Sequence, residues 1–197
     1  MRMGEVFRFE IEYRLRSLST WIYGALLTLL PFALLHIIDG SSSYMNSPER
    51  VTITTGIVGM LGMLVTAALF GDAATRDFSS GMHPLVFTSP LRKAEYLGGR
   101  FLGALAVNAV LLLGVPLGQI AAASMPYMDP QMFGPFRAEG YVQAYLLFLL
   151  PNLVLGGAVL FTVAALSRQM LPAFLSGVAL FIAYTFAGEM AGDLGAW

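Results

Sequence analysis

The sequence contains no cysteine, and this absence excludes several kinds of chemistry. Without thiols the chain cannot form disulfides, thiolate metal sites or a thiol nucleophile. Histidine is scarce as well: only His36 and His83 are present, which leaves little material for a zinc site. No GxxxxGK[ST] motif occurs, so the chain cannot hold ATP on a phosphate loop of that kind.

Charge is the next shortage. Charged residues make up 12% of the 197 residues, whereas soluble domains average about 25%. Eleven Lys and Arg nearly balance twelve Asp and Glu, so the net charge of −1 gives no indication of a nucleic-acid partner. Hydrophobic residues reach 57% and the mean hydropathy is +0.71, more than a soluble domain of this length can bury. The same values exclude a disordered chain, and they are typical of an integral membrane protein.

Five apolar stretches are long enough to cross the hydrocarbon core of a bilayer, which takes about 20 helical residues. None has a charged residue in its middle, as expected from the cost of burying a charge in lipid. We therefore predict an all-α fold, a polytopic membrane helix bundle with about five transmembrane helices. The expected spans cover residues 20–38, 52–70, 101–124, 141–166 and 170–188.

The basic residues predict the orientation of this bundle. Nine of the eleven precede the first span or lie between spans two and three or four and five, and only Arg50 and Arg137 fall on the other side. By the positive-inside rule the N-terminus is cytoplasmic, and after five crossings the chain ends outside. We expect a multi-pass protein of the plasma (inner) membrane.

Residues 6–18, before the first span, fit two kinds of structure. Phe7, Phe9 and Ile11 alternate with charged residues, as in a strand, but opposite charges at i,i+4, such as Arg8 and Glu12, favour a helix. Because a single strand beside a membrane has no partner for its backbone, we expect an amphipathic helix in the interface over residues 1–19. Residues 20–197 then form the membrane bundle.

Residues 71–100, between the second and third expected spans, mix charges with apolar residues that a solvent loop does not need. Gly81 and Pro84 interrupt this segment. The pattern is typical of a short surface helix offered to a soluble partner. It equally fits an amphipathic loop that packs on its own bundle, and the residues alone leave both interpretations open.

A resemblance to a known family favours the first interpretation. FGDAATRDFSSGMHPLVFTSPLRKAEYLGGRFLGA, residues 70–104, resembles the segment between the second and third helices of ABC-type export permeases of the second class. FRFEIEYRLRS (7–17) is similar to their elbow helix. Residues 125–141 and 150–171 look most like long permeases joined in one chain to a zinc aminopeptidase-like domain. Such permeases have six spans in each half and that domain needs an HExxH pair, so we interpret this five-span sequence as the N-terminal region of a longer protein.

The resemblance implies a permease subunit, without a cofactor or enzyme activity of its own, that couples ATP hydrolysis by a partner to export. Its implied partners are an ABC ATP-binding subunit, a second permease half or second copy, and the lipid bilayer. It places a coupling helix at residues 74–88, within a cytoplasmic coupling loop at 71–100. The candidate contacts to the ATPase are Arg76, Asp77, Phe78, His83 and Leu85. Alternatively, Asp72, Arg76 and Asp77 simply cap the second span and pair with one another.

Two pairs of glycines predict close helix packing. Gly99 with Gly103, and Gly114 with Gly118, put small residues on one face, so another helix backbone can approach. That helix can belong to the same chain or to a second copy. No metal site is predicted, because His36 and His83 fall on opposite sides of the expected bundle.

Two other classes of function remain as alternatives. A secondary transporter usually has internal repeats and ionisable groups within its spans, and neither is visible. A non-transporting membrane scaffold requires neither feature. A membrane-embedded protease is disfavoured, since the sequence has no pair of aspartates inside the spans and neither a GxSG nor an EExxxR motif.

Overall fold

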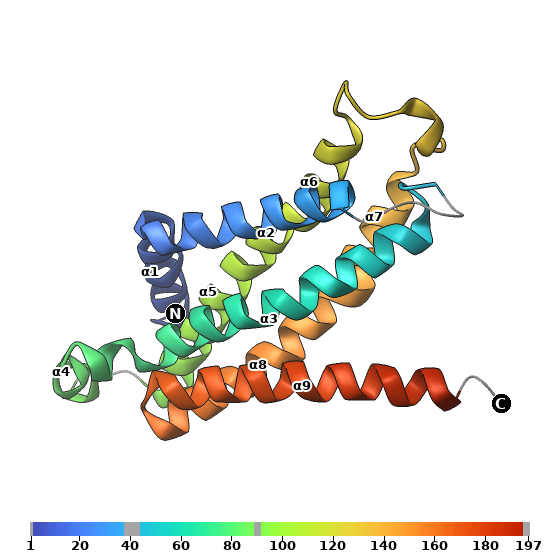
Figure 1. Cartoon of the computed structure of the whole chain (residues 1–197). Coiled ribbons are helices and arrows are strands. Elements are labelled where there is room, and N and C mark those ends of the chain that lie inside the picture. The colour runs from blue at the N-terminus through green and yellow to red at the C-terminus, as the bar shows by residue number, and fades with distance from the viewer. Residues whose placement is uncertain (1, 38–43, 89–91, 195–197) are drawn as a thin grey trace. The chain divides into compact units, whose positions relative to one another are not determined.

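A computed structural model describes residues 2–37, 44–88 and 92–194 of the chain (Figure 1). These residues are mostly helical and contain no strand, so the prediction of an all-α fold is confirmed and residues 6–16 lie in a helix. The helices are α1 (Arg2–Arg16), α2 (Leu18–Ile37), α3 (Pro48–Ser79), α4 (His83–Thr88), α5 (Lys93–Leu112), α6 (Gly114–Ala123), α7 (Ala138–Ala144), α8 (Leu150–Ser167) and α9 (Met170–Leu194), with a 3-10 turn η1 (Pro130–Met132) and a π-helical segment η2 (Tyr145–Leu149).

Four helical segments are long and apolar enough to cross a membrane, which gives the chain the helices of a membrane protein. They are Leu18–Ile37, Pro48–Ser79, Lys93–Ala123 and Ala138–Ser167. The fifth expected span corresponds to α9, a helix of 25 residues whose described side chains form an apolar segment at Met170–Phe186. The helices therefore follow the expected order of spans.

The chain forms two compact units that alternate along the sequence. Unit 1 consists of Met1–Glu12, Met63–Ala106 and Val154–Trp197, and unit 2 of Tyr13–Gly62 and Val107–Leu153. Long helices such as α3 and α5 contribute residues to both units. Each unit has its own interior, described separately below.

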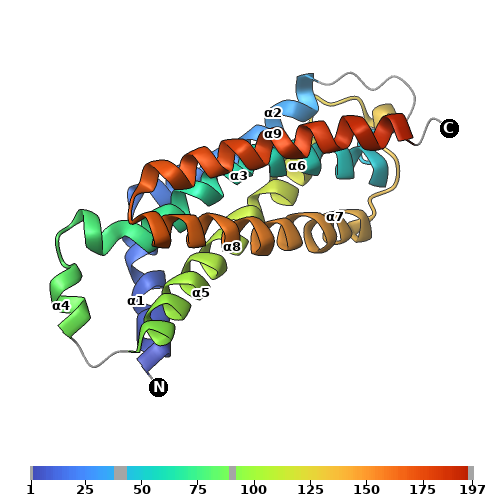
Figure 2. The same cartoon turned by 90° about the horizontal axis from the view of Figure 1, so that it is seen from below.

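Unit 1 is centred on three aromatic rings. Phe70 is fully buried, and its ring centroid lies 5.3 Å from that of Phe101 and 6.4 Å from that of Phe161. Gly157 makes room for this cluster, because a Cβ there would lie 2.6 Å from the Phe70 ring. In this unit α9 runs beside α8 (Figure 2), where a Cβ on Gly177 would reach Leu160 at 3.6 Å.

Unit 2 packs α2 directly against α6 (Figure 1). A Cβ on Gly118 would collide with the carbonyl oxygen of Thr28 and lie 2.9 Å from the Pro31 ring, so only glycine permits this approach. Beside this contact, the buried amide of Gln119 on α6 donates from Nε2 to the Thr55 hydroxyl of α3 at 3.1 Å. The α2–α6 contact itself depends on close backbone packing at Gly118.

Several helix boundaries differ from those expected. Ser47 and Pro48 start α3 four residues before the expected span, with the Arg50 N–H donating to the Ser47 hydroxyl at 3.3 Å. At its other end α3 continues to Ser79, although we expected a loop from residue 71. The connection to α5 is therefore confined to residues 80–92, and the short helix within it is α4 rather than a helix over 74–88.

Candidate functional site

Glu10 on α1 is the centre of the most polar part of unit 1, and it is fully buried. It can be buried because α5 presents glycines to α1. A Cβ on Gly99 would lie 2.7 Å from the Val6 Cβ, and one on Gly103 would lie 2.6 Å from the Glu10 Cβ. These two glycines therefore allow close packing between two helices of the same chain. The close approach places the Glu10 carboxylate between the helices.

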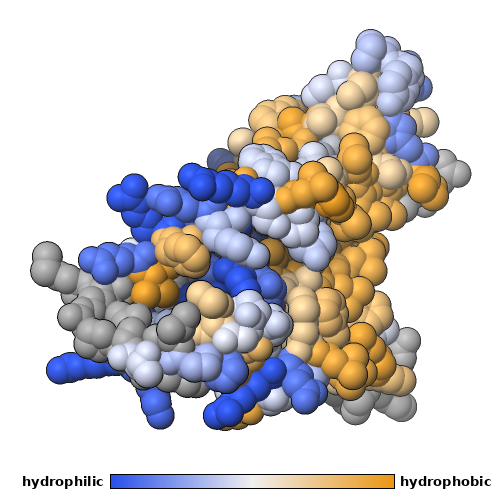
Figure 3. All heavy atoms as spheres, turned by 90° about the vertical axis from the view of Figure 1, so that its left-hand side faces the viewer, coloured by the Kyte–Doolittle hydropathy of each residue, from blue (hydrophilic) through white to orange (hydrophobic). Residues whose placement is uncertain are grey.

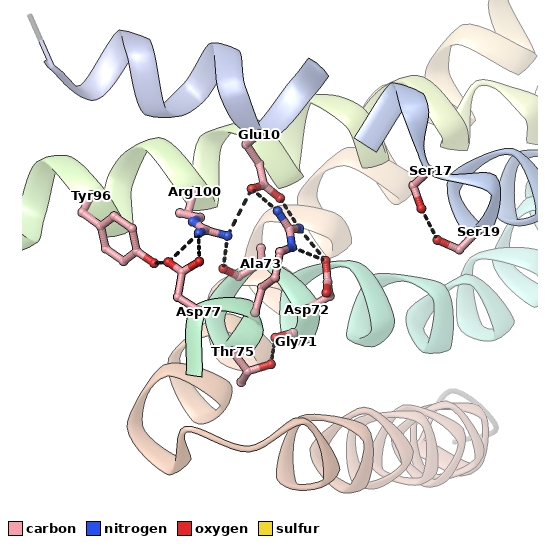
Figure 4. A network of polar contacts seen from close by, with 11 residues as sticks. Glu10, Ser17, Ser19, Gly71, Asp72, Ala73, Thr75, Asp77, Tyr96 and Arg100 are labelled. Carbon is pink, nitrogen blue, oxygen red and sulfur yellow. Dashed lines mark hydrogen bonds and ion pairs between the residues drawn. The ribbon is translucent and has the colours of Figure 1, made fainter. Parts of the chain in front are cut away.

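Two arginines surround the Glu10 carboxylate. Arg76 near the end of α3 makes a two-pronged ion pair with it, at 3.1 Å from Nη1 to Oε2 and 3.0 Å from Nη2 to Oε1. Arg100 of α5 approaches Oε2 at 3.5 Å (Figure 4). Asp72 holds Arg76 from the other side, accepting from its Nε at 3.2 Å. The i,i+4 spacing of Asp72 and Arg76 also keeps this part of α3 helical, which explains why the helix runs past residue 70.

Asp77 extends the network to the start of α5. Nη2 of Arg100 lies 2.6 Å from both carboxylate oxygens of Asp77, and the Tyr96 hydroxyl donates to the same carboxylate (Figure 4). This hydrogen bond from the Tyr96 hydroxyl holds the Asp77 side chain in place.

The network contains three carboxylates and two guanidinium groups in a largely closed cluster. The side chains of Glu10 and Arg100 are 0% and 5% exposed, so neither charge can rely on water. Buried charges of this kind need partners, because removing one partner leaves the other uncompensated. We therefore assign this ionic network, Glu10, Asp72, Arg76, Asp77, Tyr96 and Arg100, a positioning role that joins α1, α3 and α5 within unit 1.

The predicted contact residues separate into two groups. Arg76 and Asp77 are mostly buried in the ionic network. Arg76 pairs with Asp72, as in the alternative that paired these charges with one another, whereas Asp77 pairs with Arg100. Phe78 and His83 lie beyond it, with their rings stacked at 5.4 Å. Leu85 belongs to α4, but its side chain lies outside the described residues.

Arg168, which the sequence did not single out, directly follows α8 and contacts Phe78. Its guanidinium carbon lies 5.1 Å from the centre of the Phe78 ring, a cation–π contact. The backbone of Arg168 has φ of +56°, a left-handed conformation that costs a side-chain-bearing residue about 1 kcal/mol. Glycine is the usual residue at such a helix end, so an arginine at this position does not favour the local backbone conformation.

Gly114 and Gly118 belong to the α2–α6 contact of unit 2. A Cβ on Gly114 would collide with the Thr28 hydroxyl, so this glycine pair also serves packing inside the chain. In the part of the chain that the structure describes, no group of three His, Cys, Asp or Glu side chains is placed to hold a metal ion. The candidate site is therefore the ionic network together with α4 and the residues that contact it.

No protein-family model matches the sequence, and no curated protein is detectably similar to it. The function must consequently be argued from the site and from the sequence motifs. Two features of the site bear on the function directly. One is the short helix α4 between the long apolar helices α3 and α5, and the other is the buried ionic network that joins α3 and α5.

Proposed function

We propose that the chain is the membrane-spanning permease subunit of an ABC-type exporter, with α4 as the coupling helix that contacts an ATP-binding subunit. In this proposal the partner hydrolyses ATP, and the membrane chain transmits the resulting movement of α4 to its long helices. The second half of the transporter is another permease or a second copy. The protein lies in the plasma (inner) membrane, and its N-terminus and α4 are on the cytoplasmic side.

The observation that carries the proposal is the position of α4 between α3 and α5. It is only six residues long; its residues Pro84 and Thr88 and the preceding Met82 are exposed. A protein interface typically has apolar anchors within a charged rim, and Met82 lies close in sequence to the charged residues of α3 and α5. This arrangement offers a soluble partner a small contact attached to two apolar helices.

The ionic network supports the same role, because a coupling element is useful only if its movement reaches the membrane helices. The stack of His83 on Phe78 links α4 to the end of α3. The Arg100–Asp77 pair then links α3 to α5, and Glu10 links both to α1. Well-packed elements move as a unit rather than deforming continuously, so a displacement of α4 is passed on.

The proposal is tested by capture of the ATP-binding protein encoded nearest to this gene on the immobilised membrane chain in detergent. Wild type is compared with the double variant Met82→Asp/Leu85→Asp, which places two charges in the expected contact. Met132→Asp is the matched control, because Met132 and Met82 are both 49% exposed and Met132 lies on the expected outer side.

We expect wild type and Met132→Asp to capture the ATPase and the double variant to lose it. A folded wild-type chain that captures no ATPase would contradict the permease proposal and favour a membrane scaffold or a secondary transporter. Equal capture by all three chains would retain a partner but exclude α4 as its contact.

A further inference from the structure

The end of unit 1 that carries the ionic network also contains a cleft of about 500 Å³ that the coupling role does not use. It lies among the ends of α3 and α8 and the beginnings of α4 and α5. On the side of the molecule turned to the viewer in Figure 3, hydrophilic residues gather beside hydrophobic ones. The polar and aromatic residues that line the cleft are Asp77, Phe78, His83, Lys93, Tyr96 and Arg168.

The charges that line this cleft leave it positive. Its one carboxylate, Asp77, is already held by Arg100 and by the Tyr96 hydroxyl. Arg168 and Lys93, in contrast, have no carboxylate partner among the residues that the structure describes. The Arg168 side chain rests on the Phe78 ring, which positions its charge without neutralising it. An anionic group entering the cleft therefore meets two cations.

The rest of the cleft wall is apolar. Leu97 of α5 and Ala165 and Leu166 of α8 line it, and Leu166 is 79% exposed. These residues belong to the polar ends of apolar helices, the level at which headgroups lie when such helices cross a bilayer. A ligand suited to the cleft thus combines an anionic group with a hydrocarbon part.

We propose that this cleft binds an anionic phosphate group carried on an apolar body, as in the headgroup region of an acidic phospholipid. Arg168 and Lys93 contact the phosphate, and Leu97 and Leu166 contact the hydrocarbon. Basic pockets between membrane helices recognise acidic headgroups by this combination of charge and shape. The site needs only the membrane chain, so it does not depend on the proposed ATPase partner.

Arg168 allows a variant that removes the charge without harming the fold. Because its backbone is left-handed, Arg168→Gly deletes the cation while placing the favoured residue at the end of α8. We expect its thermal midpoint to equal or exceed that of wild type. Any loss of binding then reflects the missing guanidinium rather than unfolding.

The experiment is native mass spectrometry of the purified full chain in detergent, with added phosphatidylglycerol or with phosphatidylcholine of the same acyl chains. We expect wild type to retain phosphatidylglycerol in preference, and Arg168→Gly and Lys93→Gln each to reduce its affinity about fivefold. Arg92→Gln is the matched control, because Arg92 is exposed and adjacent to Lys93 but does not line the cleft. It is expected to bind like wild type.

Two further arms identify the source of the phosphate. If millimolar inorganic phosphate displaces the lipid, the site accepts soluble phosphate compounds; if the lipid stays bound and Leu166→Ala weakens it, the ligand is a membrane lipid. Three results would overturn the proposal. Arg168→Gly could bind phosphatidylglycerol as tightly as wild type, or Arg92→Gln could lose as much affinity as the cleft variants. Wild type could also bind both lipids equally. Loss of partner capture in Arg168→Gly with unchanged lipid binding would overturn it as well, since the cation would then serve a protein contact.

Discussion

Units 1 and 2 both bring two helices together through a pair of glycines spaced four residues apart, but different groups fill the two contacts. In unit 1, Gly99 and Gly103 admit α1, and the approach delivers the Glu10 carboxylate to two arginines. In unit 2, Gly118 admits the backbone of α2 at Thr28, and no ion pair is involved among the described residues of that contact. The same sequence pattern therefore specifies proximity alone, and the residue that faces it decides whether the contact is ionic or apolar.

The largest expected effect comes from breaking the ionic contact of unit 1. Glu10→Gln keeps the shape of the side chain but leaves Arg76 and Arg100 with one carboxylate fewer in a buried place. We expect a loss of about 3 kcal/mol in the free energy of unfolding. Denaturant unfolding of the purified chain in detergent, followed by circular dichroism, measures it.

Glu12→Gln is the control for that variant. Glu12 lies on the same helix and accepts from Arg8 at 2.7 Å, but its side chain is 50% exposed. Exposed pairs contribute little because water screens them, so this substitution is expected to leave stability unchanged within error. Equal losses in Glu10→Gln and Glu12→Gln would contradict the contrast between the buried network and the surface of α1.

The apolar contact of unit 2 is broken by adding a single methyl group. Gly118→Ala places a Cβ against the carbonyl of Thr28, which belongs to the backbone and cannot rotate away. We expect a loss of about 2 kcal/mol. The thermal midpoint in detergent is the measurement.

Gly56→Ala provides the comparison, since nothing lies within 4 Å of a Cβ at that position of α3 in the same unit. Alanine is the better helix former, so this variant is expected to gain about 0.5 kcal/mol. Similar thermal midpoints for Gly118→Ala and Gly56→Ala would show that α2 and α6 can move apart without loss of stability.

The smallest of the three losses is expected at the edge of the ionic network. Tyr96→Phe removes the hydroxyl that donates to Asp77 and should cost about 1 kcal/mol at neutral pH. Denaturant unfolding of Tyr96→Phe beside wild type measures the difference. Equal free energies of unfolding for the two chains would show that this hydroxyl does not stabilise Asp77.

The sequence predicted the class of fold because length and hydropathy suffice to recognise apolar helices. It underestimated α3 at both ends for different reasons. The start was encoded in the cap residues Ser47 and Pro48, which a search for apolar residues passes over. The extension to Ser79 depends on Asp72, Arg76 and the distant Glu10, so a charged sequence that resembles a loop continues as a helix.

The ionic network could not be predicted in the same way. Periodicity relates residues three or four apart, and it correctly indicated the Arg8–Glu12 pair. Glu10 reaches Arg76 across 66 residues and Arg100 across 90. The glycines at 99 and 103 indicated that some helix comes close to α5, but nothing local identified α1 as that helix.

These long separations have a consequence for the order of events on the ribosome. Chains grow at roughly 5–20 residues per second, so Glu10 is made on the order of ten seconds before Arg100. Until then its carboxylate lacks one of its partners and has to remain hydrated, which an amphipathic α1 at the membrane surface permits. The completion of unit 1 therefore follows the emergence of α5, and a nascent chain halted before that point should keep Glu10 open to water and to proteases or chemical probes.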